Sequence, residues 1–360
     1  MLINRKFWAG KRVLLTGHTG FKGSWLALWL TELGAVVTGV SLEPFSTPNL
    51  FSQLDLAQRL EQHHIADIRD PQALAEIAQA CQPQVVFHLA AQPLVRRSYR
   101  DPLGTWATNV QGSLHVLEAL KPMQHQCAVV MVTTDKVYEN QEWIYGYREN
   151  DRLGGHDPYS ASKAAAELAI ASWRSSFCGG DNHQTPYLAI ATARAGNVIG
   201  GGDWAEDRIV PDAIRALTSG QSISVRNPTA TRPWQHVLEP LSGYLVLAQQ
   251  LLNSSKPLCE AFNFGSTPSS NRTVAELVES ILTHWDGTWV VAGKRNAPHE
   301  AGLLHLEIEK ARYHLDWRPT WNYDMTLERT MHWYKEVHAK ATPYSLSIED
   351  LMKYQAAMAR

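Results

Sequence analysis

The sequence has few cysteines and no long apolar run. Its cysteines are Cys81, Cys127, Cys178 and Cys259, and none forms the CxxC spacing typical of metal or redox sites. Reduced, structural thiols in a cytoplasmic protein are therefore expected. No apolar stretch approaches the ~20 residues of a membrane helix, and the amino-terminal residues lack the apolar core of a signal peptide. No contact with a membrane is expected.

Neither a charge excess nor a metal motif is present. The formal net charge is −2 over 360 residues, so bulk electrostatics indicate no nucleic-acid partner. The 15 histidines form no HxxxH or HExxH pair on a convincing helix, and no metal site is predicted. Hydrophobic residues make up 44% and charged residues 19%, which is typical of a globular protein.

The first half of the chain alternates apolar runs with stretches of helical periodicity. Strands are expected over residues 11–17, 35–42, 63–68, 83–91, 127–134 and 187–200, and helices over 24–34, 70–81, 102–120 and 157–173. Asp70 and Pro71 give the second of these helices an amino-terminal cap. Strands joined by helices predict an α/β fold with a Rossmann-type doubly wound parallel sheet.

The pattern loosens after about residue 200, where a glycine-rich loop is followed by shorter elements. We predict an NAD-binding Rossmann domain over residues 1–198, to which 234–258 also return. Residues 199–360 are expected to form mainly a smaller, discontinuous lobe that binds the substrate.

A glycine loop links the first expected strand to the first expected helix. Its sequence, TGHTGFKG, places Gly17, Gly20 and Gly23 at GxxGxxG spacing. Glycines there let a pyrophosphate approach the backbone at a helix amino terminus, so a dinucleotide site is predicted. Further cofactor contacts are expected from Thr19, Phe21 and Lys22.

The ends of the next two strands bear on which dinucleotide binds. Ser41 closes the second strand and could bond a ribose hydroxyl, and no nearby arginine is present to hold a 2′-phosphate. NAD is therefore favoured over NADP. Asp67 and Ile68 close the third strand, where the carboxylate either accepts a hydrogen bond from the adenine amino group or faces solvent.

Two further stretches carry residue types suited to proton transfer. YSASK places Tyr159 and Lys163 four residues apart, on one face of a helix. An ammonium group near a phenol favours the phenolate, which can take a proton from a hydroxyl group. The fifth strand ends in Thr134, Asp135 and Lys136, where the charged pair is either surface or part of an active site.

Several motifs together resemble the extended short-chain dehydrogenase/reductase superfamily over nearly the whole chain. They are GxxGxxG at 17–23, HLAA at 88–91, Asn109, TTDKVY at 133–138, YSASK at 159–163 and ARYHLDWRPTW at 311–321. GHTGFKGSWL, TTDKVYEN and RPWQHVLEPLSGYL are most similar to the sugar-nucleotide 4,6-dehydratase branch that takes CDP-sugars. The resemblance implies dehydration of CDP-glucose to CDP-4-keto-6-deoxyglucose, with NAD recycled internally.

Within that resemblance, Thr134 and Tyr159 hold the C4 hydroxyl of the sugar, and Asp135 protonates the C6 hydroxyl that leaves. Other dehydratases usually carry Thr-Asp-Glu, and Lys136 stands where the glutamate serves as base for the C5 proton. The lysine either acts as that base or remains charged and stabilises the enolate.

The remaining expected contacts come from the loops that follow the strands. Cofactor contacts are expected at Leu89, Ala90, Ala91, Thr108 and Thr133. Substrate contacts are expected at Gln92, Val95, Asn197, Arg208, Val225, Arg226, Arg232 and His299. For each arginine the alternative is a solvated surface ion pair.

Two other functions remain open. The first is an epimerase or a dehydratase for another nucleotide sugar, and Asp135 argues against the epimerase because epimerisation expels no leaving group. The second is a non-catalytic dinucleotide sensor, which both Tyr159 and Lys163 argue against. The resemblance also implies a homodimer or a dimer of dimers, formed through the helices near residues 104–120 and 162–173.

Overall fold

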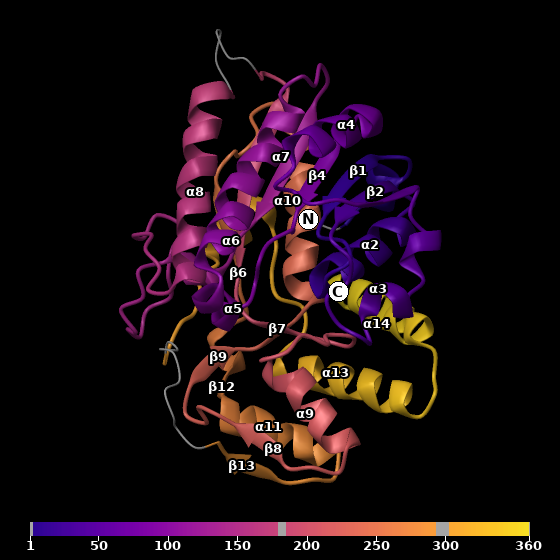
Figure 1. The fold of residues 1–360 in the computed structure, drawn as a ribbon, viewed down its shortest axis with the longest axis vertical. Helices are drawn as coiled ribbons and strands as arrows, with labels where there is room; N and C mark the ends of the chain where they lie inside the picture. The colour runs from indigo at the N-terminus through magenta and orange to yellow at the C-terminus, as the bar shows by residue number, and fades with distance from the viewer. Residues whose placement is uncertain (1–2, 179–184, 293–301, 360) are drawn as a thin grey trace.

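The computed structural model describes residues 3–178, 185–292 and 302–359. Its centre is a seven-stranded parallel sheet in the order β11-β6-β5-β4-β1-β2-β3 (Figure 1). The strands are β1 (Arg12–Thr16), β2 (Val36–Ser41), β3 (Gln62–Ile65), β4 (Val85–His88), β5 (Cys127–Val132), β6 (Leu188–Ala195) and β11 (Ala261–Phe264). The predicted Rossmann-type doubly wound sheet is therefore confirmed.

Helices cover both faces of this sheet. One face carries α4 (Pro71–Cys81), α7 (Gly112–Leu120) and α8 (Pro158–Phe177), and the other carries α2 (Phe21–Glu32) and α10 (Leu238–Asn253). Successive residues of a strand are buried on opposite faces: Leu14 packs in the first layer and Leu15 in the second. Both faces are covered, so the strands are almost continuously apolar.

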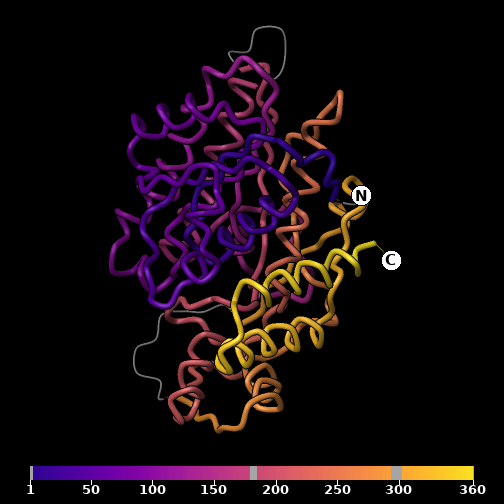
Figure 2. Tube along the Cα trace, turned by 90° about the vertical axis from the view of Figure 1, so that its right-hand side faces the viewer, coloured from indigo at the N-terminus to yellow at the C-terminus, as the bar shows by residue number. Residues whose placement is uncertain are grey.

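A smaller lobe lies below the carboxyl ends of the strands (Figure 1). Its elements are α9 (Ile209–Thr218), β8 (Ile223–Val225), β9 (Thr231–Pro233), β12 (Asn271–Thr273), α11 (Val274–His284) and β13 (Trp289–Val291). Short strands β7 (Val198–Ile199) and β10 (Gln235–His236) pair at the junction. Of the carboxyl-terminal helices, α12 (Glu309–Leu315) packs beside β11, whereas α13 (Tyr323–His338) and α14 (Pro343–Met358) lie side by side between the lobe and the sheet (Figure 2).

Some elements differ from their predicted form. The helix expected over 102–120 consists of α6 (Pro102–Trp106), a π-helical turn η2 (Ala107–Gln111) and α7. Helix α2 begins directly after Gly20, three residues earlier than predicted. The cap of α4 is confirmed, because the Asp70 carboxylate accepts hydrogen bonds from the backbone of Gln72 and Ala73. Strand β11 had no counterpart in the prediction.

The remaining short helices flank the sheet edges and loops. They are α1 (Arg5–Trp8), α3 (Leu50–Gln53), η1 (Leu56–Gln58), α5 (Val95–Arg100), η3 (Asp135–Val137) and η4 (Pro268–Ser270). Helix α5 follows the loop after β4, and η3 follows β5. Both therefore lie at the carboxyl edge of the sheet, where ligands bind in folds of this kind.

A buried ion pair joins α8 to the sheet directly behind that edge. The Arg194 guanidinium donates to the Glu167 carboxylate at 2.8 Å, and both side chains are buried. Thr133 and Thr192 also donate to Glu167, and the phenol of Tyr138 accepts a hydrogen bond from Arg194. The two charges are thus paired away from water, and neither residue can be lost alone without leaving the other unpaired.

We therefore expect Arg194→Ala to lower the free energy of unfolding by about 3–5 kcal/mol, because Glu167 would stay buried without its partner. Chemical denaturation of the purified protein measures this change. Arg312→Ala is the matched control: Arg312 pairs with Glu309 on the surface of α12, where such pairs are worth roughly 0–1 kcal/mol. Equal effects of the two substitutions would contradict the prediction.

Candidate active site

One cleft of about 1550 Å³ lies between the carboxyl edge of the sheet and the smaller lobe. Its walls come from the loops after β1, β4, β5 and β6 on one side and from α9, β8 and β9 on the other. Small-molecule sites usually occupy roughly 300–1000 Å³. The larger volume suits two ligands side by side, such as a dinucleotide and a sugar nucleotide.

The glycine loop forms the floor of this cleft. Gly17 has a φ of +80°, and a Cβ there would lie 2.6 Å from the Ala90 nitrogen. A Cβ on Gly23 would lie 2.0 Å from the Gly17 oxygen. Larger residues are excluded at both positions, and the amino terminus of α2 faces the cleft. This backbone cradle fits the pyrophosphate of a dinucleotide.

The loops after β2 and β3 form the outer end of the same cleft. The hydroxyl groups of Thr19 and Ser41 lie 2.7 Å apart, at the place predicted for a ribose. The Arg69 guanidinium donates to both carboxylate oxygens of Asp67, so this side chain does not simply face solvent. This pair lowers the pKa of Asp67. Ile68 lines the cleft beside it.

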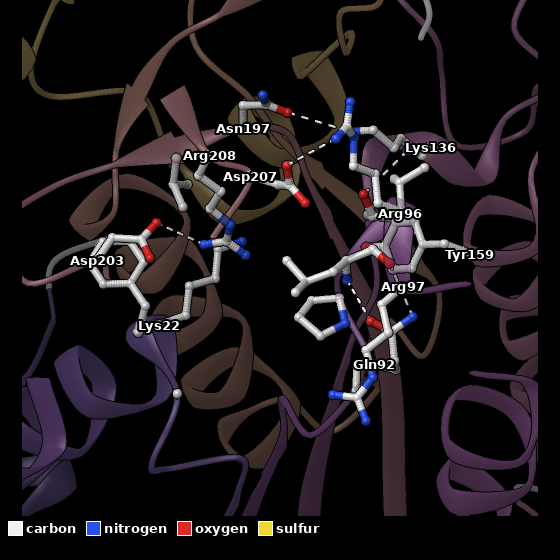
Figure 3. Close-up of a pocket in the computed structure, with 18 of the residues that line it drawn as sticks. Lys22, Gln92, Arg96, Arg97, Lys136, Tyr159, Asn197, Asp203, Asp207 and Arg208 are labelled. Atoms are coloured by element: carbon white, nitrogen blue, oxygen red, sulfur yellow. Dashed lines mark hydrogen bonds and ion pairs between the residues drawn. The ribbon is translucent and has the colours of Figure 1, made fainter. Parts of the chain in front are cut away.

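Two cations approach one another between the glycine loop and the lobe. Figure 3 shows the Lys22 side chain extending toward Arg208. Asp203 holds the Arg208 guanidinium at 2.8 Å. Burial, and then the charge of Arg208, lower the pKa of Lys22 to about 7. Positive charge is thus concentrated where the phosphates of two ligands would meet.

The acid after β5 faces the cleft and is 2% exposed, so the surface alternative for Asp135 is wrong. Thr134 caps the turn η3, and its hydroxyl donates to Asp135 Oδ1 at 2.9 Å. The Lys136 ammonium lies 3.7 Å from the same oxygen and donates to Asn197 Oδ1 at 3.4 Å. Lys136 therefore links the loops that follow β5 and β6.

Tyr159 and Lys163 lie in the first turns of α8. Asp157 caps this helix, and Tyr159 is only 8% exposed. Burial raises the pKa of Tyr159 to about 12, although a contact with the Thr134 side chain opposes this shift. The Lys163 ammonium donates to the Val132 carbonyl at 3.1 Å, and burial lowers its pKa to about 8. Tyr159 thus faces the Thr134–Asp135 corner of the cleft.

A buried asparagine fixes the loop after β4 against α8. The Asn109 side chain accepts from the Gln92 nitrogen at 2.8 Å and donates to the Ser162 hydroxyl at 2.9 Å. The Gln92 side-chain amide donates to the Leu94 carbonyl within its own loop and to the Thr105 hydroxyl on α6. The predicted contacts that line the cleft from this side are Leu89, Ala90, Ala91, Gln92, Val95, Thr108 and Thr133.

The predicted substrate contacts divide into three groups. Asn197, Arg208, Arg226 and Arg232 line the cleft. Val225 does not: it is fully buried in the hydrophobic core, and its neighbour Ser224 lines the cleft instead. A strand residue alternates faces with its neighbours, which explains the difference. His299 lies outside the described residues.

Sequence reasoning missed several charged residues that line this cleft, among them Arg96 and Asp207. Both line it, and the Arg96 guanidinium lies 3.4 Å from the Asp207 carboxylate. The only signal in the sequence was the basic run that follows Val95. Asp207 gave no signal, because its partner lies 111 positions earlier in the chain.

The described part of the chain contains neither a metal-binding cluster of side chains nor a helix that could span a membrane. No group of three or more histidine, cysteine, aspartate or glutamate side chains in residues 3–178, 185–292 and 302–359 is arranged to hold a metal ion. Among the same residues, no helix combines the length and apolar content that crossing a membrane requires.

A protein-family model shows which family the chain belongs to. The model of the GDP-mannose 4,6 dehydratase family matches residues 14–330. The chain belongs to this family. A CDP-glucose 4,6-dehydratase of Salmonella typhimurium is 48% identical to this chain over 336 residues, which cover 93% of both chains.

Solved structures of other proteins share the fold of this chain. DesIV of Streptomyces venezuelae, a dTDP-glucose 4,6-dehydratase with NAD and TYD bound, superposes with a TM-score of 0.77 at 24% identity, over 92% of this chain and 99% of that one. A UDP-glucose 4-epimerase of Thermotoga maritima gives 0.74 at 22% identity, over 91% and 99%. Dehydratases and epimerases thus share this architecture, and the side chains in the cleft must distinguish them.

Proposed function

We propose that the protein dehydrates CDP-glucose to CDP-4-keto-6-deoxyglucose and that NAD is its recycled cofactor. The observation that carries this proposal is the cleft itself, where Thr134, Asp135 and Tyr159 meet in a chain 48% identical to a CDP-glucose 4,6-dehydratase. The glycine cradle fits the dinucleotide. When bound, NAD would supply the acceptor for the C4 hydride and the donor that returns it to C6.

The side chains divide the proton transfers between them. Tyr159, beside Thr134, takes the proton of the C4 hydroxyl group once its phenol has ionised. Thr134 orients that hydroxyl group. Asp135 enters this step protonated and gives its proton to the C6 hydroxyl group, which then leaves as water rather than as hydroxide. The carboxylate that remains is paired with the Lys136 ammonium. An epimerase needs no such acid, so the buried Asp135 favours the dehydratase.

Lys136 has its own task in this scheme. Its ammonium contacts the Asp135 carboxylate and the Asn197 amide, and its side chain remains 29% exposed. We therefore propose that Lys136 remains charged and that the C5 proton passes to solvent at this partly exposed corner of the cleft. The ammonium then stabilises the negative charge that develops on the C4 oxygen.

Lys136→Met is expected to lower turnover about 10²–10³-fold, because the charge that stabilises the enolate is lost. Lys136→Arg is the matched control, since it keeps a charge but cannot act as a base near neutral pH. We expect partial activity and continued exchange of the C5 proton with deuterated solvent in the arginine variant. If both variants lose exchange completely, Lys136 is the base instead.

Product analysis tests the proposed reaction directly. The protein is incubated with CDP-glucose and NAD, and a product that has lost one water and carries a 4-keto-6-deoxy sugar is expected by mass spectrometry and NMR. Parallel incubations with dTDP-, UDP- and GDP-glucose test the preference for the base. Turnover of another nucleotide sugar in preference to CDP-glucose would overturn the assignment, and formation of CDP-galactose would identify an epimerase.

We also propose that the protein is cytoplasmic and forms a homodimer or a dimer of dimers. Exposed apolar side chains on two helices support the assembly: Leu103 and Trp106 on α6 are 83% and 42% exposed, and Leu168 on α8 is 61% exposed. Such side chains mark a surface that a second copy can cover. Light scattering of the purified protein measures the mass of the assembly.

A further inference from the structure

Three charged side chains form a network that spans the cleft. Arg96 projects from α5, at the edge of the sheet, and its guanidinium lies 3.4 Å from Asp207 Oδ1. Arg226, directly after β8 in the lobe, donates to that same oxygen. All three residues line the cleft. One carboxylate thus bridges an arginine from each side of the site, and Figure 3 shows Arg96 and Asp207 facing one another.

The two arginines are held unequally. Arg226 makes a second bond, from its guanidinium to the Asp207 carbonyl at 3.2 Å, whereas the only ion pair of Arg96 within the described residues is the longer one. Arg96 Nε is buried and has no hydrogen-bond partner in that part of the chain. A guanidinium has five donors, and a buried donor without a partner costs free energy. Arg96 is therefore poised to bind a further anion.

The position of this pair along the cleft indicates which anion. The Thr134–Asp135–Tyr159 corner would hold the sugar, and α9 and β8 form the far end of the same cleft. Arg96 belongs to α5, whose Ser98 hydroxyl accepts a hydrogen bond from the Tyr159 nitrogen. Asp207, in contrast, lies just before α9. The ion pair between Arg96 and Asp207 therefore links the two ends of the cleft (Figure 3). In a sugar nucleotide, the group between sugar and nucleoside is the diphosphate. Guanidinium groups bind phosphate oxygens in pairs, so the chemistry matches.

We propose that Arg96 binds the diphosphate of the sugar nucleotide, and that the Asp207 carboxylate takes the place of a phosphate until the substrate enters. This inference rests on the proposed function, because the expected ligand is its substrate class. Binding exchanges one anionic partner of Arg96 for another, so the guanidinium keeps an anionic partner throughout. A substrate dianion can contact Arg96 and Arg226 together.

The exchange has a consequence for selectivity. A diphosphate offers two charged groups and can replace the carboxylate at both arginines. A single phosphate can satisfy only one of them while it is repelled by Asp207. The site should therefore bind nucleoside diphosphates more tightly than monophosphates. The ratio of the two affinities should exceed the one that a second phosphate would give at a site without the Asp207 carboxylate.

Calorimetric titration of the NAD-loaded protein with CDP and with CMP tests the proposal. Arg96→Gln should weaken CDP binding about 10- to 100-fold, the usual range for a charge-assisted hydrogen bond, and should affect CMP much less. Arg96→Lys keeps the charge but lacks the paired donors of a guanidinium, so its affinity for CDP should lie between those of the native protein and Arg96→Gln. Asp207→Asn should tighten CDP binding several-fold, and this gain should be smaller in the Arg96→Gln background, because the two residues are coupled.

Glu206→Gln is the matched control. Glu206 pairs with Arg100 at 3.6 Å between the same loop and the same helix, but neither lines the cleft and both are about two-thirds exposed. Its affinity for CDP should equal that of the native protein. Unchanged CDP binding in Arg96→Gln and Arg96→Lys would overturn the inference. Weaker binding in Asp207→Asn would also overturn it, since Asp207 would then position the arginines.

The same titrations with UDP, dTDP and GDP separate this inference from the proposed function. If another nucleoside diphosphate binds best and still depends on Arg96, the CDP-glucose assignment fails while the diphosphate site stands. If CDP-glucose is dehydrated normally but no diphosphate depends on Arg96, the reverse holds.

Discussion

Replacing Asp135 by asparagine is expected to lower dehydration of CDP-glucose about 10²–10⁴-fold, the usual contribution of a positioned general acid. The amide preserves the size and the hydrogen bond from Thr134 but has no proton to give to the leaving hydroxyl group. Oxidation at C4 and exchange of the C5 proton precede that transfer. Substrate recovered from deuterated water should therefore still carry deuterium at C5, which NMR measures.

Glu139→Gln is the matched control for this experiment. Glu139 also lines the cleft, four residues further along the chain, but it pairs at the surface with Arg152. Its substitution should leave turnover within a few-fold of the native rate. Loss of C5 exchange together with dehydration in Asp135→Asn would contradict the acid role, because the carboxylate would then act before the elimination.

The local patterns of this chain predicted the parts of the fold that local physics determines. The GxxGxxG spacing identified the cradle because Gly17 and Gly23 leave no room for a Cβ. Asp70 and Pro71 located the start of α4, since a cap acts within one turn of chain. The cap of α4 and the clash of a Gly23 Cβ with the Gly17 oxygen both join residues close in sequence. The clash at Gly17 is with the Ala90 backbone, so only the positive φ of Gly17 is a local feature.

Other features depend on packing between distant segments. The π-helical turn at 107–111 interrupts a continuous helical pattern and accompanies the buried position of Asn109 beside Gln92 and Ser162. Periodicity alone does not distinguish such a turn from an α-helix. Strand β11 has only four residues, and its place beside β6 comes from the tertiary fold. Short apolar runs of this kind are ambiguous in sequence.

The candidate site divides in the same way. Tyr159 and Lys163 were predicted as one unit from their spacing, but the Lys163 ammonium bonds the Val132 carbonyl. This hydrogen bond forms because the Lys163 side chain is buried against the end of β5, and the motif YSASK alone does not show which of its side chains are buried. The Arg96–Asp207 pair was missed altogether, because it joins the sheet to the lobe.

Tyr159→Phe is expected to lower turnover about 10²–10⁴-fold, because the proton of the C4 hydroxyl group would lose its acceptor. The pKa of Tyr159 is raised to about 12 by burial in the protein alone, so the phenol is neutral at pH 7. Catalysis requires the phenolate, and nearby positive charge from Lys163 and the bound oxidised nicotinamide favours it. The rate should therefore rise with pH until the pKa of Tyr159 in the complex is reached.

The pH profile distinguishes this role from a structural one. Lys163→Met removes a positive charge near the phenol, which raises the pKa of Tyr159 and moves the rising limb of kcat/KM to higher pH. Tyr145→Phe is the control, since Tyr145 is 66% exposed and does not line the cleft. Its profile should match that of the native protein. An unmoved limb in Lys163→Met would show that another group sets the profile, because a base that ionises beside Lys163 must respond to loss of that charge.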